Sequence, residues 1–218
     1  MDAVRFLLFL HVAFGVLALL SAFVSASNKK GAKLHRRSGR VFFWSMLGVG
    51  VTAIPVTFFR PNPFLFFIAL FSFYMALAGY RRGKSKFVYG QIDIVASLAM
   101  TLTAFVMIGY GIFMVVTGAP LGWALVAFGG LGLNFGIEDF VLSKKEMSHL
   151  KKIEIHLARM LGGTIATITA VLVQQVTPLV DGEILKLALW LGPTIIITPL
   201  IFIWVARIEA TKKYKLFA

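Results

Sequence analysis

The chain has 218 residues, of which 59% are hydrophobic and only 14% are charged. A soluble domain usually has about 25% charged residues, and the mean hydropathy here is +0.86. These values exclude an ordinary soluble domain and predict an integral membrane protein. The sequence contains no cysteine, which excludes disulfides and thiolate ligation of zinc or iron–sulfur clusters. A bound metal would need histidine, carboxylate or backbone oxygen ligands.

Seven segments are long and apolar enough to cross a bilayer, whose core of about 30 Å needs about 20 residues per helix. They cover residues 3–26, 39–59, 63–80, 90–116, 121–142, 153–179 and 187–208. The first ends in small residues, as a signal peptide does, but the basic residues follow it instead of preceding it, which favours a retained helix. The connections are short. The sequence therefore predicts an all-α protein in which residues 1–218 form one bundle of seven transmembrane helices.

The net charge of +13 is distributed over alternate connections. The basic residues of these connections are Lys29, Lys30, Lys33, Arg36, Arg37, Arg40, Arg81, Arg82, Lys84, Lys86, Lys144, Lys145, Lys151, Lys152, Arg207, Lys212, Lys213 and Lys215. By the positive-inside rule, this pattern places the N-terminus outside and the C-terminus in the cytoplasm. Because topology accounts for the charge, we expect anionic lipid headgroups, and not nucleic acid, to contact the basic side.

Segment 153–179 carries the clearest polar face in the chain. At helical spacing of three and four residues, this face contains His156, Arg159, Gly163, Thr167, Ala170 and Gln174. An arginine at the centre of a bilayer costs roughly 2.5–3.5 kcal/mol on insertion scales, so the ionisable residues should face protein or water. This face is therefore the first candidate for a functional site.

Segment 121–142 brings a carboxylate towards the same end. Gly129, Gly132, Gly136 and Asp139 share one helix face, and glycines at this spacing allow another helix backbone to approach closely. The short connection to segment 153–179 predicts that the two helices are neighbours, so Asp139 can pair with Arg159 or with His156. Glu138 points about 100° away, towards headgroups or a loop lysine.

Three further ionisable residues are candidates. His11, in the first segment, forms either a single interhelical hydrogen bond or part of a ligand or proton pathway. Asp93 opens the fourth segment, where it either caps the helix and pairs with loop cations or belongs to a site. His35 lies in the basic loop before the second segment, on the same side as His156, where it is either an exposed interfacial residue or a ligand.

Several stretches resemble an uncharacterised family of bacterial multi-span membrane proteins, a domain of unknown function. They are HVAFGVLALLSAF, KGAKLHRRSGRVFFW, FSFYMALAGYR, GIEDF and HLARMLGGTIATITAVLV. The resemblance implies a multi-pass protein of the bacterial inner membrane, but no activity. The positions that it implies as recurrent are His11, His35, Arg36, Gly39, Asp139, His156, Arg159 and Gly163.

A fainter resemblance, to cytochrome b561-type haem proteins, comes from the Lys-x-x-x-Leu-His stretch that ends at His35. Those proteins use paired histidines from facing helices. His11 has no histidine at its own depth, so the resemblance implies at most one haem b, bound between His35 and His156.

The sequence leaves four functions open, as well as whether the chain is an enzyme or a homo-oligomer. Proton-coupled or small-solute transport would use His11 and Gln174 in the outer half and the Asp139–His156–Arg159 group in the inner half. A zinc-type metal centre would use His35, His156 and Asp139, with Asp93 as a further ligand. Haem-b electron transfer would use His35 and His156. In a purely structural protein, the buried polar groups would only fix helix packing.

Overall fold

The structure is a computed structural model that describes residues 3–84 and 87–215, without the side chains of residues 208, 209 and 211–215. Lys86, one of the charges that predict the topology, lies outside the described residues, as do the side chains of Lys212, Lys213 and Lys215. The secondary-structure elements of the described residues are all helices. These are α1 (Ala3–Ser27), α2 (Lys33–Phe59), α3 (Pro63–Arg82), α4 (Gln91–Val116), α5 (Gly122–Leu142), α6 (His149–Val176), a 3₁₀ turn (Thr177–Leu179) and α7 (Glu183–Lys215).

Seven helices in the described residues are long and apolar enough to cross a membrane, as the hydropathy pattern predicts. Three of them, α2, α6 and α7, begin earlier than predicted, and α7 does so at Glu183 instead of residue 187. Helix α2 starts at Lys33, because the chain reverses at Gly31, whose φ of 77° suits glycine. Helix α6 starts at His149, where the Ser148 hydroxyl accepts a hydrogen bond from the Lys151 amide at 3.3 Å. The predicted basic loop before the second helix is therefore mostly helical, and His35 lies on α2.

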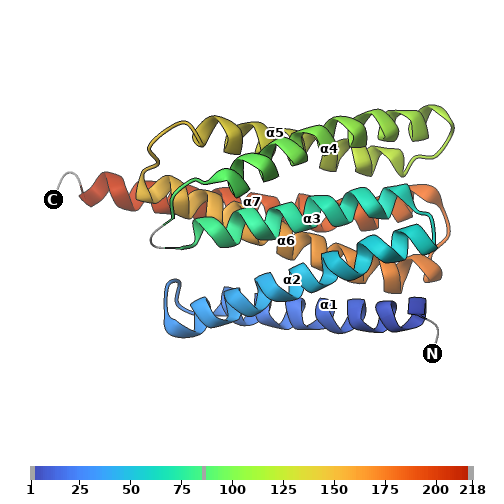
Figure 1. Ribbon diagram of the computed structural model, residues 1–218, viewed down its shortest axis with the longest axis horizontal. Helices are drawn as coiled ribbons and strands as arrows, with labels where there is room; N and C mark the ends of the chain where they lie inside the picture. Colours follow the sequence, from blue (N-terminus) through green and yellow to red (C-terminus); the bar gives the residue numbers. More distant parts are fainter. Residues whose placement is uncertain (1–2, 85–86, 216–218) are drawn as a thin grey trace.

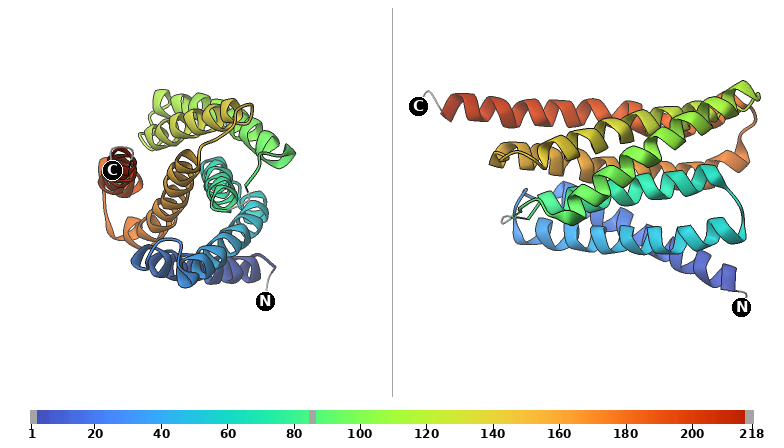
Figure 2. Two further views of the ribbon diagram at one scale, coloured as in Figure 1. Left: turned by 90° about the vertical axis from the view of Figure 1, so that its left-hand side faces the viewer. Right: turned by 45° about the horizontal axis from the view of Figure 1, so that its top comes forward.

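The helices form a bundle in which α3 and α6 occupy the middle (Figure 1). The α1–α2 hairpin covers one side and the α4–α5 hairpin the other, while α7 packs beside α6 (Figure 2). The two ends of the chain lie at opposite ends of the bundle (Figure 1). Helix α3 contacts α2, α4, α5 and α6, so its side chains meet those of most of the other helices.

Glycines bring α4 and α5 into close contact. A Cβ added at Gly136 would lie 2.5 Å from the Thr101 hydroxyl and 3.0 Å from the Ser97 carbonyl oxygen, both on α4. At the other end of the pair, a Cβ at Gly122 would overlap the Gly111 carbonyl oxygen. The predicted glycine face of α5 is therefore used for close approach, although its partner is α4 and not α6.

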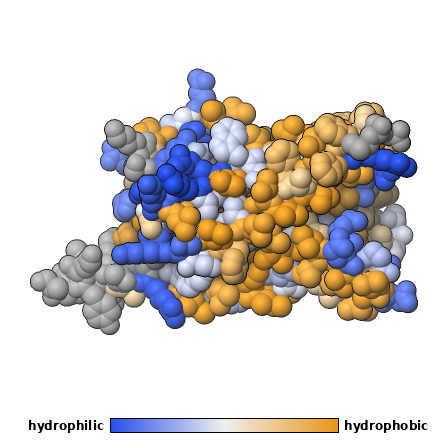
Figure 3. All heavy atoms as spheres, turned by 90° about the horizontal axis from the view of Figure 1, so that it is seen from below, coloured by the Kyte–Doolittle hydropathy of each residue, from blue (hydrophilic) through white to orange (hydrophobic). Residues whose placement is uncertain are grey.

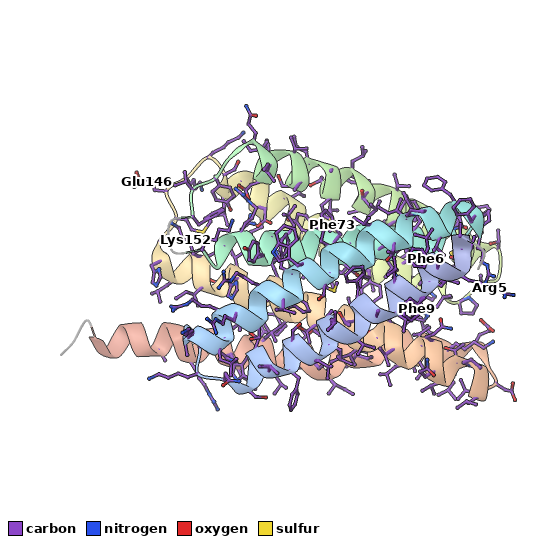
Figure 4. The ribbon with its side chains drawn as sticks, turned by 60° about the horizontal axis from the view of Figure 1, so that its bottom comes forward. Arg5, Phe6, Phe9, Phe73, Glu146 and Lys152 are labelled. Carbon is purple, nitrogen blue, oxygen red and sulfur yellow. The ribbon has the colours of Figure 1, made fainter. Side chains whose placement is uncertain are left out.

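The outer surface is apolar between two polar ends. Exposed side chains include Phe23 at 71%, Val116 at 79% and Ile196 at 72% of their full area, whereas soluble proteins rarely expose large contiguous apolar patches. Figure 3 shows this apolar band between hydrophilic ends. Lys152 and Glu146 lie at one end of the bundle and Arg5 lies at the other (Figure 4). These features support a multi-pass membrane protein.

Candidate functional site: a buried arginine–carboxylate centre

The centre is built around Asp139, whose exposed fraction is only 1%. Asp139 lies near the C-terminal end of α5 and accepts a short hydrogen bond from the Tyr74 hydroxyl on α3. Its carboxylate oxygens also lie 3.1 Å from Nη2 of Arg82 on α3 and 3.3 Å from Nη2 of Arg159 on α6. One carboxylate thus joins three helices. The predicted Asp139–Arg159 contact is present.

Arg82 is the last residue of α3 and is 3% exposed. Its guanidinium also donates to the Ala78 carbonyl at 3.0 Å and to the Tyr89 hydroxyl at 3.2 Å, and it lies over the Phe87 and Tyr89 rings. Burial raises the pKa of Tyr89, although the positive charge of Arg82 opposes that rise. The Tyr89 hydroxyl therefore stays neutral and accepts from Arg82.

Arg159 reaches α5 through two carboxylates and an aromatic ring. Its Nη2 donates to Glu138 at 2.8 Å as well as to Asp139, and its guanidinium carbon lies 3.8 Å from the centre of the Phe135 ring. Glu138 in turn binds Lys151 at 3.0 Å, and Lys151 binds Glu154 at 2.7 Å. Glu138 therefore meets the predicted lysine, and it also meets Arg159, which helical spacing does not predict.

The buried part of the centre has more donors than acceptors. Two guanidinium groups share the Asp139 carboxylate, and only the Glu138 and Lys151 side chains at the rim, each about one-third exposed, extend the network. Among the described residues, the Nε atoms of Arg82 and Arg159 are buried without a hydrogen-bond partner. Leaving a buried donor unpaired typically costs about 1–3 kcal/mol. These two unpaired hydrogen-bond donors are the main chemical feature of the centre.

His156 does not belong to this centre. Its Nδ1 lies 2.7 Å from the Gly79 carbonyl oxygen of α3, and its ring lies 6.3 Å, centre to centre, from the ring of His35 at an angle of 82°. The structure thus brings His35 and His156 together, whereas the Asp139 carboxylate contacts Tyr74 and the two arginines instead. Within the described residues, no group of three His, Cys, Asp or Glu side chains could hold a metal ion.

The remaining sequence candidates lie elsewhere. Asp93 is 4% exposed, binds Arg81 through two 2.6 Å contacts and accepts a hydrogen bond from the Gly90 amide at 2.9 Å. His11 lies 3.1 Å from the Thr52 hydroxyl and 3.2 Å from the Val49 carbonyl, both on α2. Gln174 is exposed near the C-terminal end of α6. The contacts of Asp93 and His11 match the cap, ion-pair and interhelical alternatives for these residues.

Two residues of the centre, Tyr74 and Arg82, are absent from the candidates that the sequence indicates. The charge pattern accounts for Arg82 only as a topology residue, and Tyr74 lies in an apolar, aromatic segment. A signal is nevertheless present in the sequence, because Tyr74, Ala78 and Arg82 follow one another at steps of four and share one helix face.

Comparisons with family models, with curated proteins and with solved structures found no match, so the family resemblance stays a prediction and the function is inferred from the residues themselves.

Proposed function

We propose that this protein transports a small anionic solute across a membrane together with a proton, and that Asp139, Arg82 and Arg159 form its binding centre. The observation that carries this proposal is that two buried arginines share one buried carboxylate at the junction of α3, α5 and α6. Ionisable residues inside membrane helices usually mark ion or substrate pathways. Arginine forks suit carboxylate and phosphate-like groups, since they donate two parallel hydrogen bonds.

The chemistry of exchange follows from the same contacts. An anion that enters the centre takes the place of the Asp139 carboxylate against Arg82 and Arg159, and it also meets their unpaired Nε donors. Asp139 then takes up one proton, so that the charge of the centre is unchanged. Release of the anion returns the proton from Asp139 and restores the two ion pairs. One anion and one proton therefore move together.

A purely structural role accounts less well for this arrangement. A single ion pair is enough to fix two helices, and a buried ion pair is weak evidence for stability because desolvation offsets most of its attraction. The second arginine adds another buried charge and leaves further donors without partners in the described chain.

We place the centre on the cytoplasmic side, with the N-terminus outside, in a bacterial inner membrane. The support for this orientation is that Arg82 ends α3 and Asp139 lies close to the end of α5, where the basic connections lie. A reporter fused after Ala218 is expected in the cytoplasm and one before Met1 outside; the reverse result would refute this orientation.

We also propose that anionic lipid binds the basic side at an open, shallow groove on α1 and α2. Phe14, Arg37, Arg40, Val41, Trp44 and Ser45 line it. Arg37 and Arg40 are exposed, one turn apart on α2, and the described residues provide no ion-pair partner for either. They are therefore available to a phosphate group, while the apolar wall accommodates acyl chain.

The transport proposal can be tested in proteoliposomes that contain a pH-sensitive dye. Inward gradients of chloride, nitrate, acetate, lactate and phosphate are applied in turn, and acidification of the lumen is recorded. With at least one anion, the wild type should acidify the lumen faster than protein-free vesicles do, since undissociated weak acids such as acetic acid cross the bilayer unaided. Arg82→Lys keeps the charge but removes the fork, so flux should fall to the level of protein-free vesicles.

The matched control is Arg81→Lys, one residue away, which changes the Arg81–Asp93 pair and leaves the centre intact. It should transport like the wild type. Folded wild-type protein that acidifies the lumen no faster than protein-free vesicles with each of the five anions would refute the proposal.

A further inference from the structure

We infer that His35 and His156 form a two-imidazole site for a first-row transition-metal ion of the Co²⁺ to Zn²⁺ series. The site lies at the end of the bundle that carries the basic connections, and it is separate from the Asp139 centre. It brings together one residue from α2 and one from α6, both of which are predicted to lie on the same side.

The hydrogen bonds of the two rings fix which nitrogen is free. Nδ1 of His156 lies 2.7 Å from the Gly79 carbonyl oxygen. Nδ1 of His35 lies 3.0 Å from the Ser25 carbonyl oxygen and 2.9 Å from the Ser25 hydroxyl, which can accept as well as donate. A carbonyl oxygen can only accept, so each Nδ1 carries the proton and each Nε2 carries the lone pair. A backbone acceptor on the far nitrogen is the arrangement that orients metal-ligating histidines.

Neither Nε2 atom forms a hydrogen bond within the described residues. The unpaired Nε2 of His156 is not fully enclosed by the described residues. It therefore keeps some access to the surface. Two lone pairs from different helices are therefore available to one ligand.

The two rings are close, but they must move together to share a tetrahedral ion. With bonds of about 2.0–2.1 Å, two imidazole nitrogens on such an ion lie about 3.3 Å apart and their ring centres about 5 Å apart. The ring centres of His35 and His156 are 6.3 Å apart, so the rings must approach each other by about 1 Å. Edge-to-face aromatic contacts fall in the same range of about 4.5–7 Å. The hydrogen-bond pattern, and not the distance alone, therefore distinguishes a ligand pair.

The surroundings accept an added cation. Arg159 lies one turn from His156 on α6, but its guanidinium is paired with Glu138 and Asp139 on α5. Gly83 lies against the Nδ1–Cε1 edge of the His156 ring, where an added Cβ would lie 2.6 Å from Nδ1 and 2.7 Å from Cε1. With no third protein ligand among the described residues, solvent or a small anion must complete the coordination shell.

The ligand type selects the ion. Imidazole suits Co²⁺, Ni²⁺, Cu²⁺ and Zn²⁺, whereas Mg²⁺ and Ca²⁺ require oxygen ligands. The test uses protein purified in detergent, stripped with a chelator and titrated with Zn²⁺ by calorimetry, with Mg²⁺ as the negative control. Co²⁺ absorbance then reports the ligands of the bound ion.

Asparagine variants separate a ligand role from a structural one. In His35→Asn and His156→Asn the side-chain amide can still donate to the backbone carbonyl, but Nε2 is lost. Both variants should melt close to the wild type in chelator and lose zinc affinity by more than about tenfold, the smaller loss known even for outer-shell partners. His11→Asn is the control, since its ring also contacts a backbone carbonyl but pairs with no second histidine in the described chain; it should bind zinc like the wild type.

Two results would overturn the inference: no stoichiometric zinc binding to the wild type, or unchanged binding in both asparagine variants. A haem absorbance band that is present in the purified wild type and lost in both variants would also overturn it, by assigning the pair to haem iron. If one variant does not fold, the other carries the test. Zinc binding does not depend on anion flux, so each proposal can fail without the other.

Discussion

Two arginines that are adjacent in sequence at the end of α3 have different environments. Arg81 forms a one-to-one, doubly bonded pair with Asp93, and its side chain is 20% exposed. The side chain of Arg82 is 2% exposed, and it shares the Asp139 carboxylate with Arg159. The first pair closes a loop and caps α4, since Asp93 also accepts from the Gly90 amide. A local, one-to-one ion pair whose hydrogen bonds are all made therefore suits a structural role. A carboxylate that two arginines share, with buried donors left unpaired, suits a binding centre.

The strongest test of this comparison removes the charge of Asp139. In Asp139→Asn, Arg82 and Arg159 lose their shared counter-ion inside the bundle, and breaking a buried pair from one side typically costs about 3–5 kcal/mol. Thermal unfolding in detergent should show a larger loss of stability than any of the substitutions below. If Asp139→Asn melts like the wild type, the two arginines are solvated and the centre is not buried.

The next largest effect should come from the close contact between α4 and α5 that positions Asp139. Gly136→Ala places a Cβ 3.0 Å from the Ser97 carbonyl oxygen and the Thr101 amide nitrogen, neither of which can rotate away. Overpacking of this kind costs about 1–3 kcal/mol. Gly130→Ala is the matched control on the same helix, since a Cβ there meets no described atom within 4 Å; equal melting of the two variants would contradict the packing.

A smaller effect is expected at the Arg81–Asp93 pair. Asp93→Asn keeps an oxygen for the Gly90 amide but removes the charge opposite Arg81, and we expect a loss of about 1 kcal/mol, within the usual range for cap and partly exposed pair substitutions. Proton-coupled anion flux, measured in the same vesicles as for the wild type, should not change. A variant that folds normally but loses flux would place Asp93 in the transport pathway and erase the contrast between the two arginines.

The smallest effect on stability should come from the groove on α2. The double variant Arg37→Gln, Arg40→Gln should unfold within about 0.5 kcal/mol of the wild type, as surface substitutions usually do. It should nevertheless retain less anionic lipid on purification, because each basic residue near an anionic surface contributes about 1 kcal/mol of attraction. Lipid is measured by mass spectrometry, with Arg36→Gln, outside the groove lining, as control; equal lipid in all three proteins would contradict the site.

The seven helices and the residues that can carry chemistry follow from the amino-acid sequence alone. Apolar length and hydropathy are properties of each segment alone, so the helices are predictable before they pack. Helical spacing likewise placed Asp139 on the glycine face of α5. The short connection between α5 and α6 limits how far apart their adjoining ends can lie, which made the Asp139–Arg159 contact predictable. The prediction that the two helices pack as neighbours was nevertheless wrong, because α5 packs mainly on α4.

Which polar groups meet depends on how the helices pack. His156 and Arg159 lie one turn apart on α6, and their shared face predicts that both can meet Asp139, yet Arg159 reaches α5 whereas His156 contacts the Gly79 carbonyl of α3 and the ring of His35. Tyr74 and Arg82 entered the centre because α3 packs between the two hairpins. The physical reason is that spacing fixes the angle of a side chain about its own helix axis, while the neighbour that it meets depends on the rotation, depth and order of the packed helices, which no single segment encodes.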